Sequence, residues 1–387
     1  MRWWILAVLF LARTCMALEF QVLGAVAPLA GPALGLNHAA MGQLLGLYWL
    51  PGIFLAIPAG LLGQRFGLKR LGLASLTLMA FGGRLLAASW NYPTAAAARL
   101  IEGAGNAVLS VMISAMVAAW FRDRELSTAM ATVFDSWQFG LAASLVLFPP
   151  IAAWSSWHGA IHAATLVCVA AAVLVALVYR APPAGEARPT ARLPNRAKLL
   201  GRAGLIPTLA ALVWTTYNVG QIIFLTYGPP LLAARGMPLA EGARIVSLSV
   251  WIAMITMPLG GFLADRSRHP LRLVVFGAAG SGGVDILFAM GADPTLTCLA
   301  MSVLIGLPAG SILALPTGAV AREDVTWSLG WFMAVYYVLV TLGQFLAGSI
   351  REVTSDQTTV LFGAGLILAT VPCLIPIRAL QRRAVPA

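Results

Sequence analysis

Long apolar stretches separated by short polar ones follow each other along almost the whole chain. A helix needs about 20 apolar residues to cross the hydrocarbon core of a bilayer. Stretches of that length cover 4–29, 39–63, 71–90, 95–119, 127–152, 158–179, 205–232, 243–264, 271–290, 294–319, 327–349 and 358–378. The pattern predicts an all-α membrane protein with twelve transmembrane helices.

One polar break is longer than the others. Residues 180–204 are rich in Pro, Gly and Arg and show no apolar period, which is typical of a loop. They predict a cytosolic linker between an N-terminal six-helix bundle (1–179) and a C-terminal six-helix bundle with a short cytosolic tail (205–387).

Composition supports the membrane interpretation. Of 387 residues, 60% are hydrophobic and 10% are charged, against about 25% charged in a soluble domain. So few charges cannot solvate a soluble surface, which excludes a soluble enzyme, a disordered chain and a nucleic-acid binder despite the net charge of +11.

The basic residues also predict orientation. With the N-terminus inside, 19 of the 25 Lys and Arg residues lie on the cytosolic side and three on the outer side. Because basic loops stay inside, we expect a multi-pass protein of the bacterial cytoplasmic (inner) membrane with both termini cytosolic. Arg2 and the apolar residues after it resemble a secretory signal, but the apolar character continues to Leu29, too far for one.

Metal and cofactor chemistry is not indicated. The four cysteines lie singly in four spans, without ligand spacing, and are interpreted as packing residues. His158 and His162 are four residues apart, but no third ligand accompanies them. We expect no metal and no cofactor.

A short motif occurs twice, 201 residues apart, each time after the second span of a half. The first copy reads GLLGQRFGLKR over 60–70 and the second GFLADRSR over 261–268. Glycines allow helices to approach closely, and an acid at a helix end can accept hydrogen bonds from a neighbouring helix N-terminus. The repeat predicts a gating latch at the cytosolic surface, formed by Gly60, Gln64, Arg65, Gly67, Arg70, Gly261, Asp265 and Arg266.

This motif resembles the G-x-L-x-D-R-x-G-[RK]-[RK] signature of the major facilitator superfamily, and RLIEGAGNA over 99–107 resembles its R-x-x-x-G-x-G-x-A segment. The resemblance covers essentially the whole chain and implies a secondary transporter, not an enzyme. Gln64 replaces the family's Asp, so the charged part of the latch falls to Asp265 and Arg266. The third span and Trp120-Phe121 are loosely similar to cyanate and nitroimidazole permeases of that superfamily.

Ionisable residues at membrane depth are costly and are candidates for function. Arg13 and Asp135 fall near the midplane and are expected to form an ion pair. Glu19, Arg99 and Glu102 fall in the outer half and are expected to form a second cluster. Because burial favours the neutral form of a carboxyl group, these groups suit proton coupling, and the set predicted for it is Glu19, Arg99, Glu102 and Asp135. Arg84 and Asp285 occupy matching positions in the two repeats and are interpreted as structural.

Polar residues recur on single helix faces. Arg99, Glu102, Asn106, Ser110 and Ser114 are spaced for one face, which predicts a water-accessible line. In the second half, amides accompany aromatic residues, and an amide facing lipid would be unsatisfied. The residues predicted to bind substrate are Arg13, Asn106, Gln138, Trp214, Tyr217, Asn218, Gln221, Trp251, Tyr337 and Gln344.

Together these features predict a proton-coupled secondary transporter of a small organic or inorganic anion, working by alternating access. The expected partners are a small-molecule substrate, a coupling proton and the lipid bilayer, with the protein a monomer. The alternative is a drug/proton antiporter of the multidrug-efflux type, although the Gly-Pro motif usual in such antiporters is missing from the fifth span. An intramembrane enzyme would need a nucleophile and a base at matched depth, and none can be assembled.

Overall fold

The computed structural model describes residues 2–36, 38–121, 125–181, 202–267, 269–318 and 325–382, and these residues contain helices and no strands. In chain order the helices are α1 (Arg2–Ala25), α2 (Ala27–Ala33), α3 (His38–Gly46), α4 (Leu50–Phe66), α5 (Leu68–Ala87), α6 (Tyr92–Phe121), α7 (Leu126–Trp154), α8 (Trp157–Val178), α10 (Arg202–Ala234), α11 (Leu239–Arg266), α12 (Pro270–Ala289), α13 (Pro294–Gly318), α14 (Val325–Val353) and α15 (Asp356–Arg382).

The predicted spans coincide with these helices, and the all-α membrane fold is confirmed. Eleven helical segments of the described residues are long and apolar enough to cross a membrane. The remaining predicted span, 71–90, is α5. It carries Lys69 and Arg70 in its first turn and Arg84 in its last turn, which lowers its average hydropathy.

Two predicted spans consist of two helices each rather than one. The first is divided at Val26, between α1 and α2, and the second by the turn over 47–49, between α3 and α4. Proline stands at the start of both second helices, where the missing N–H is not needed. The hydropathy pattern cannot detect these breaks because the residues at them are as apolar as their neighbours.

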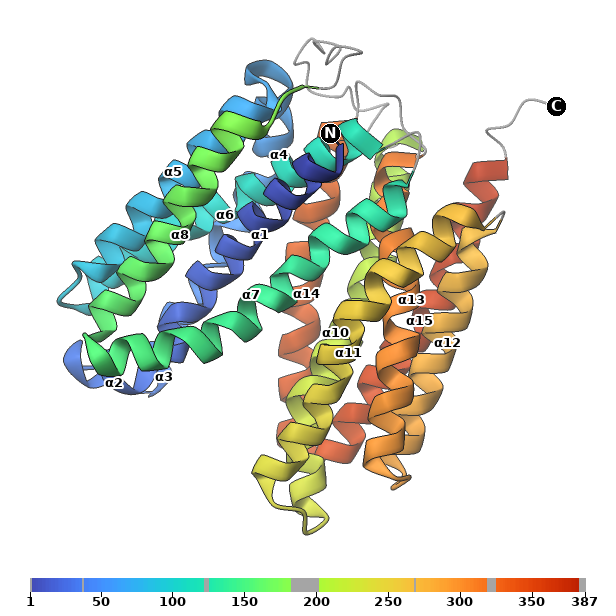
Figure 1. Ribbon diagram of the computed structural model, residues 1–387. Coiled ribbons are helices and arrows are strands. Elements are labelled where there is room, and N and C mark those ends of the chain that lie inside the picture. The colour runs from blue at the N-terminus through green and yellow to red at the C-terminus, as the bar shows by residue number, and fades with distance from the viewer. Residues whose placement is uncertain are drawn as a thin grey trace. The chain divides into compact units, whose positions relative to one another are not determined.

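The chain forms two compact units. Unit 1 comprises Met1–Phe121, Val133–Leu193 and Ala321–Ala334. Within it, α5 packs on α6 and α8, α1 packs on α8, and α4 packs on α6 (Figure 1). Its apolar core includes Val22, Leu44, Leu86 and Ala98, all fully buried.

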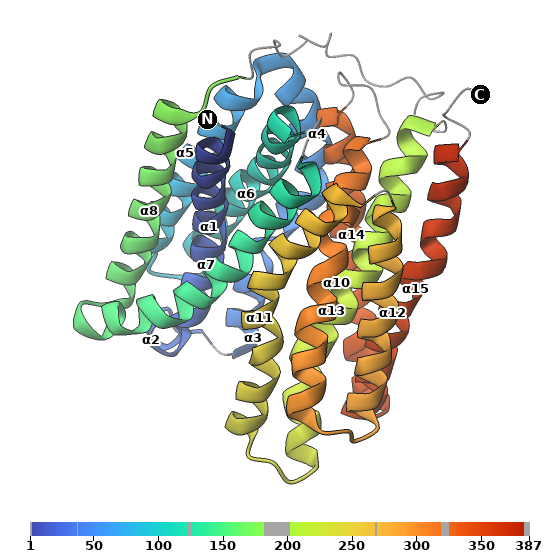
Figure 2. The same cartoon turned by 45° about the vertical axis from the view of Figure 1, so that its right-hand side comes forward.

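Unit 2 comprises Arg122–Thr132, Pro194–Val320 and Val335–Ala387. Here α12 packs on α13 and α15, α10 packs on α15, and α11 packs on α13 (Figure 2). Taken in chain order, these four pairings correspond one for one to those of unit 1. The internal repeat seen in the loop motif therefore extends to the helix packing within each unit.

The unit boundaries differ from the predicted bundles, because the first turns of α7 belong to unit 2 and the first turns of α14 to unit 1. The bundles 1–179 and 205–387 stay a prediction. Most of the predicted linker, residues 182–201, lies outside the described residues.

Candidate functional site

Three ionisable side chains from α1 and α6 meet inside unit 1. Glu19, Arg99 and Glu102 are all fully buried. Nη1 of Arg99 lies 2.6 Å from Oε2 of Glu102. The same guanidinium donates to the backbone carbonyls of Glu19, at 3.0 Å, and Phe20, at 3.1 Å. These two hydrogen bonds tie Arg99 of α6 to the backbone of α1. The expected cluster of three residues is therefore present in the structure.

Tyr48 covers this cluster from the turn between α3 and α4. The guanidinium carbon of Arg99 lies 4.6 Å from the centre of the Tyr48 ring, a cation–π arrangement. The Tyr48 hydroxyl donates to the carbonyl of Met16 at 3.0 Å. Gly103 of α6 lies directly against the Tyr48 carbonyl and leaves no room for a side chain. The helix break thus positions an aromatic ring on the buried charges.

The carboxylate of Glu19 sits in a niche between α5 and α8. A β-carbon at Gly83 would lie 2.9 Å from both Glu19 carboxylate oxygens and would also clash with the Thr165 hydroxyl. That hydroxyl donates to the carbonyl of Ile161 at 3.0 Å. With Glu102 nearby and one arginine between them, the cluster holds two acids and one base, so full ionisation would leave a net negative charge in a dry site.

Arg13 and Asp135 are both buried, on α1 and α7. The guanidinium carbon of Arg13 lies 3.9 Å from the centre of the Phe134 ring, the neighbour of Asp135 in the sequence. A ring face attracts a cation without neutralising it. The predicted Arg13–Asp135 ion pair stays a prediction. Sequence analysis missed Phe134, although its place beside an intramembrane acid could have drawn attention to it.

The polar line on α6 differs from expectation. Arg99, Glu102, Asn106, Ser110 and Ser114 lie on one face, but all five are buried. At the charged end Arg99 pairs with Glu102, and Ser114 donates to the Ser110 carbonyl at 2.8 Å. The expected water-accessible face is therefore closed in this structure.

Aromatic rings and an amide meet between α10 and α14 in unit 2. The Tyr336 hydroxyl donates to Oδ1 of Asn218 at 2.9 Å. The Trp214 ring centre lies 6.0 Å from that of Tyr217 and 6.5 Å from that of Tyr336. Tyr217 is buried and donates its hydroxyl to the carbonyl of Ile305. Tyr336 was not predicted from the sequence, and its neighbour Tyr337 was predicted instead. Two adjacent tyrosines point to different faces of a helix, so only one of them meets Asn218.

The remaining residues predicted to bind substrate differ in exposure. Gln138 and Gln221 are half-buried, Tyr337 is buried, and Trp251 and Gln344 are exposed. Their contribution to binding stays a prediction.

The second copy of the repeated motif closes onto the start of α7 within unit 2. Asp265 accepts hydrogen bonds from the backbone N–H groups of Ser127, at 3.0 Å, and Thr128, at 2.8 Å, and from the Thr128 hydroxyl at 2.6 Å. A β-carbon at Gly261 would lie 2.6 Å from the Ser127 carbonyl oxygen. A carboxylate on free N–H groups of a helix start is a favourable cap.

The first copy makes the corresponding glycine contact in unit 1. A β-carbon at Gly60 would lie 2.8 Å from the carbonyl oxygen of Thr326, in the first turn of α14. Gln64 stands where the second copy has Asp265 and brings no charge to this contact. Gly67 has a φ of +85°, which glycine adopts readily and which lets α4 turn into α5.

The basic residues of the motif lie at the surface. Arg65 and Arg266 are exposed and stack on Phe66 and Phe262, with guanidinium-to-ring distances of 5.4 and 4.0 Å, and Arg70 is exposed at the start of α5. Ser127 and Thr128 were not singled out from the sequence, although Ser and Thr at a helix start are typical capping residues.

The residues interpreted as structural have local contacts. Nη1 of Arg84 lies 3.2 Å from Nε2 of His162, across α5 and α8. His158 stacks on Trp157 with ring centres 3.8 Å apart. Asp285 is fully buried in α12.

Comparisons with known proteins agree with this architecture. The family model described as Major Facilitator Superfamily matches residues 9–326. The 3-(3-hydroxy-phenyl)propionate transporter of Escherichia coli (strain K12) is 26% identical over 319 residues, covering 78% of this chain and 73% of that protein. The hexuronate transporter of Bacillus subtilis (strain 168) is 23% identical over 383 residues, covering 93% and 89%.

A solved structure shares the fold. The human organic anion transporter MFSD10 superposes with a TM-score of 0.74 at 17% identity, over 96% of this chain and 99% of that one. The eleven candidate spans among the described residues, the twice-occurring glycine motif and the family match lead to one assignment: the chain belongs to the Major Facilitator Superfamily of membrane transporters, and it is not an enzyme.

Proposed function

We propose that this transporter carries a small anion, with organic carboxylates as the first class to test, by alternating access coupled to protons. Its setting would be the bacterial cytoplasmic membrane, as a monomer with both termini cytosolic. Alternating access would expose the binding site to each side of the membrane in turn, as the family's repeats imply.

The observation that carries the anion assignment is the burial of the Arg13 guanidinium against an aromatic ring. Its guanidinium is buried and rests on the Phe134 ring, 3.9 Å from the ring centre. A guanidinium keeps its charge under all relevant conditions and presents a planar set of donors that matches a carboxylate. A buried guanidinium of this geometry can bind a substrate carboxylate, so Arg13 favours an anion as the substrate.

Two further observations support a carboxylate. The relatives named above are transporters of a phenylpropionate and of hexuronate, both carboxylates. In unit 2, the Tyr336 hydroxyl occupies Oδ1 of Asn218, which directs the amide NH₂ group elsewhere. An amide donor beside Trp214 suits a substrate that combines a carboxylate with an apolar body.

Proton coupling is proposed for Glu19, Glu102 and Asp135. All three carboxyl groups are buried, and Arg99 binds the carboxylate of Glu102 and the backbone carbonyl of Glu19. Binding of one proton by Glu19 or Glu102 would remove the net negative charge of the cluster. We therefore expect protonation of the cluster to change how α1 packs on α6.

The anion assignment is tested by thermal unfolding of the purified chain with hydroxyphenylpropionate, glucuronate, nitrate and a lipophilic cation. A ligand at 100 times its Kd stabilises the folded state by about 2.7 kcal/mol. We expect the carboxylates to raise the midpoint in the wild type and in Arg84→Gln, but not in Arg13→Gln. Arg84 is the matched control, since it is also an arginine within a span. Stabilisation by carboxylates that survives Arg13→Gln would reject the assignment.

Coupling is tested in proteoliposomes with a pH gradient. We expect Glu19→Gln, Glu102→Gln or Asp135→Asn to abolish gradient-driven uptake while substrate exchange continues. If none of the three substitutions reduces driven uptake, proton coupling through these groups is wrong.

The second candidate is drug/proton antiport. The cluster of Phe20, Tyr48, Trp49 and Trp137, with ring centres 5.1–5.7 Å apart, favours it because such rings can hold flat apolar cations. Stabilisation by the lipophilic cation alone would favour this candidate over anion transport.

A further inference from the structure

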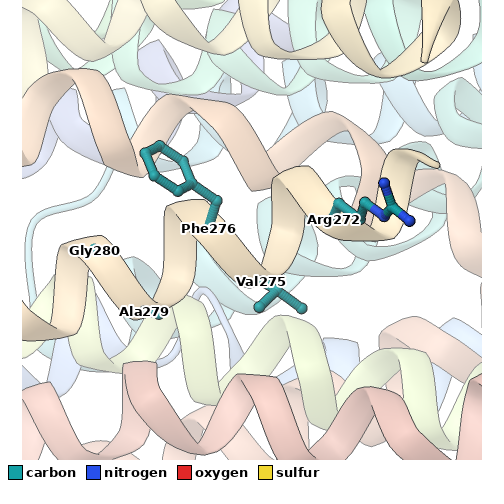
Figure 3. Close-up of a pocket in the computed structure, with 5 residues that line it drawn as sticks. All are labelled: Arg272, Val275, Phe276, Ala279 and Gly280. Atoms are coloured by element: carbon teal, nitrogen blue, oxygen red, sulfur yellow. The ribbon is translucent and has the colours of Figure 1, made fainter.

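A hollow of about 600 Å³ runs along α12, on residues that have no part in the proposed transport site. It is lined by Arg272, Val275, Phe276, Ala279 and Gly280. Their spacing of three and four residues places them on one side of the helix. In Figure 3, the side chains of Phe276 and Val275 point away from each other, and Arg272 stands toward the beginning of the helix.

The hollow exists because small residues follow large ones. Phe276 is 63% exposed and stands clear of the helix, whereas Ala279 and Gly280, one turn further on, have no long side chain. A β-carbon at Gly280 would lie 2.9 Å from the Leu304 side chain, so α13 packs directly against the helix at this point. The result is an apolar groove on the surface of α12, beside the ring of Phe276.

The dimensions match one leaflet of a bilayer. Eight residues separate Arg272 from Gly280, which corresponds to about 12 Å of helix. The hydrocarbon core is about 30 Å thick, so one leaflet takes up roughly half of that. Arg272 is exposed in the first turn of α12, where an arginine at a helix end reaches the headgroup level.

The charge at the open end is positive. The segment 266–272 contains Arg266, Arg268, His269 and Arg272 and no acid. The acid before it, Asp265, is occupied by the N–H groups of α7. Anionic lipids of the cytosolic leaflet attract such basic segments, at about 1 kcal/mol per Lys or Arg.

We propose that this hollow binds an anionic phospholipid. The phosphate would accept hydrogen bonds from the Arg272 guanidinium, and an acyl chain would lie over Ala279 and Gly280 between Val275 and Phe276. The lipid site does not depend on the substrate or on the coupling ion. Its test can therefore fail or succeed whatever the outcome for the proposed function.

The test is native mass spectrometry of the full chain with phosphatidylglycerol and phosphatidylcholine of identical acyl chains. We expect the wild type to retain phosphatidylglycerol more strongly. Arg272→Gln should weaken phosphatidylglycerol binding about fivefold, which corresponds to one arginine near the surface, and leave phosphatidylcholine unchanged. Ala279→Phe fills the hollow and should weaken both lipids.

Arg180→Gln is the matched control, because Arg180 is an exposed arginine that follows α8 and lies on the same predicted side of the membrane. It should bind both lipids as the wild type does. Equal retention of the two lipids by the wild type would overturn the proposal. So would an equal loss in Arg272→Gln and Arg180→Gln, or full phosphatidylglycerol binding by Ala279→Phe.

Discussion

Asp265 at the end of α11 holds Thr128 at the start of α7 by two hydrogen bonds to one carboxylate oxygen, 2.8 Å from the backbone nitrogen and 2.6 Å from the hydroxyl. Ser127 donates to the other oxygen at 3.0 Å. One side chain from the repeated motif thus satisfies the free N–H groups of a helix 137 residues away in the sequence.

Removing this carboxylate should loosen the proposed latch. Asp265→Ala loses a cap worth about 1 kcal/mol, which shifts the balance between latched and open forms about fivefold. We expect a lower midpoint of thermal unfolding and a changed initial uptake rate. Asp293→Ala is the control, because the Asp293 carboxylate caps its own helix by accepting a hydrogen bond from the backbone N–H of Leu296 at 2.8 Å. A latch role is excluded if both variants transport alike.

A side chain added in the niche of the Glu19 carboxylate should lower the stability of the folded protein. Gly83→Ala places a β-carbon 2.9 Å from both carboxylate oxygens and against the Thr165 hydroxyl, a contact that needs the helices to separate. We expect a lower unfolding midpoint and loss of gradient-driven uptake.

The control for this change is Gly283→Ala on α12, where an added β-carbon meets nothing within 4 Å. Alanine in a helix interior is favoured over glycine by about 0.5–1 kcal/mol, so this variant should be as stable as the wild type or more. Equal behaviour of Gly83→Ala and Gly283→Ala would show that the niche tolerates a side chain.

Substituting each member of the buried Arg99–Glu102 ion pair should show which contacts hold the other member in place. Glu102→Gln leaves Arg99 on the carbonyls of Glu19 and Phe20, whereas Arg99→Gln leaves two buried carboxylates without their base. Breaking a buried pair on one side costs about 3–5 kcal/mol. We expect Arg99→Gln to be the more damaging, and the double variant to recover part of the loss, in a double-mutant cycle by thermal or denaturant unfolding. Additive losses would mean that the two side chains do not act together.

The Tyr336 hydroxyl should orient Asn218 for substrate. Tyr336→Phe removes one hydrogen bond, worth about 0.5–1.5 kcal/mol, and frees the amide to rotate. We expect KM to rise severalfold with little change in the maximal rate. Tyr227→Phe serves as control, since Tyr227 lies on α10, the helix of Asn218, and packs on the apolar cluster of Val219, Ile223 and Ala347. An unchanged KM in Tyr336→Phe would remove Asn218 from the site.

Much of the candidate site could be predicted from the sequence, because an ionisable residue within an apolar span is conspicuous. Glu19, Arg99 and Glu102 were found this way, and their similar depths indicated that they meet. Tyr48, Phe134 and Tyr336 were missed, because an aromatic residue in an apolar span looks like ordinary packing. The burial of Asn106, Ser110 and Ser114 was also not predicted. Residue spacing shows which side chains share a helix face, but it does not show what covers that face.

The sequence by itself determined the class of protein, the positions of the apolar helices and the internal repeat. It could do so because a bilayer demands long apolar helices and the motif recurs at equal spacing. Only the tertiary structure decided which polar groups meet: Arg99 with the α1 carbonyls, Tyr336 with Asn218, and Asp265 with the start of α7. Hydropathy gives depth along a helix, whereas these contacts depend on how each helix is rotated against its neighbours, which is set by the close glycine contacts between them.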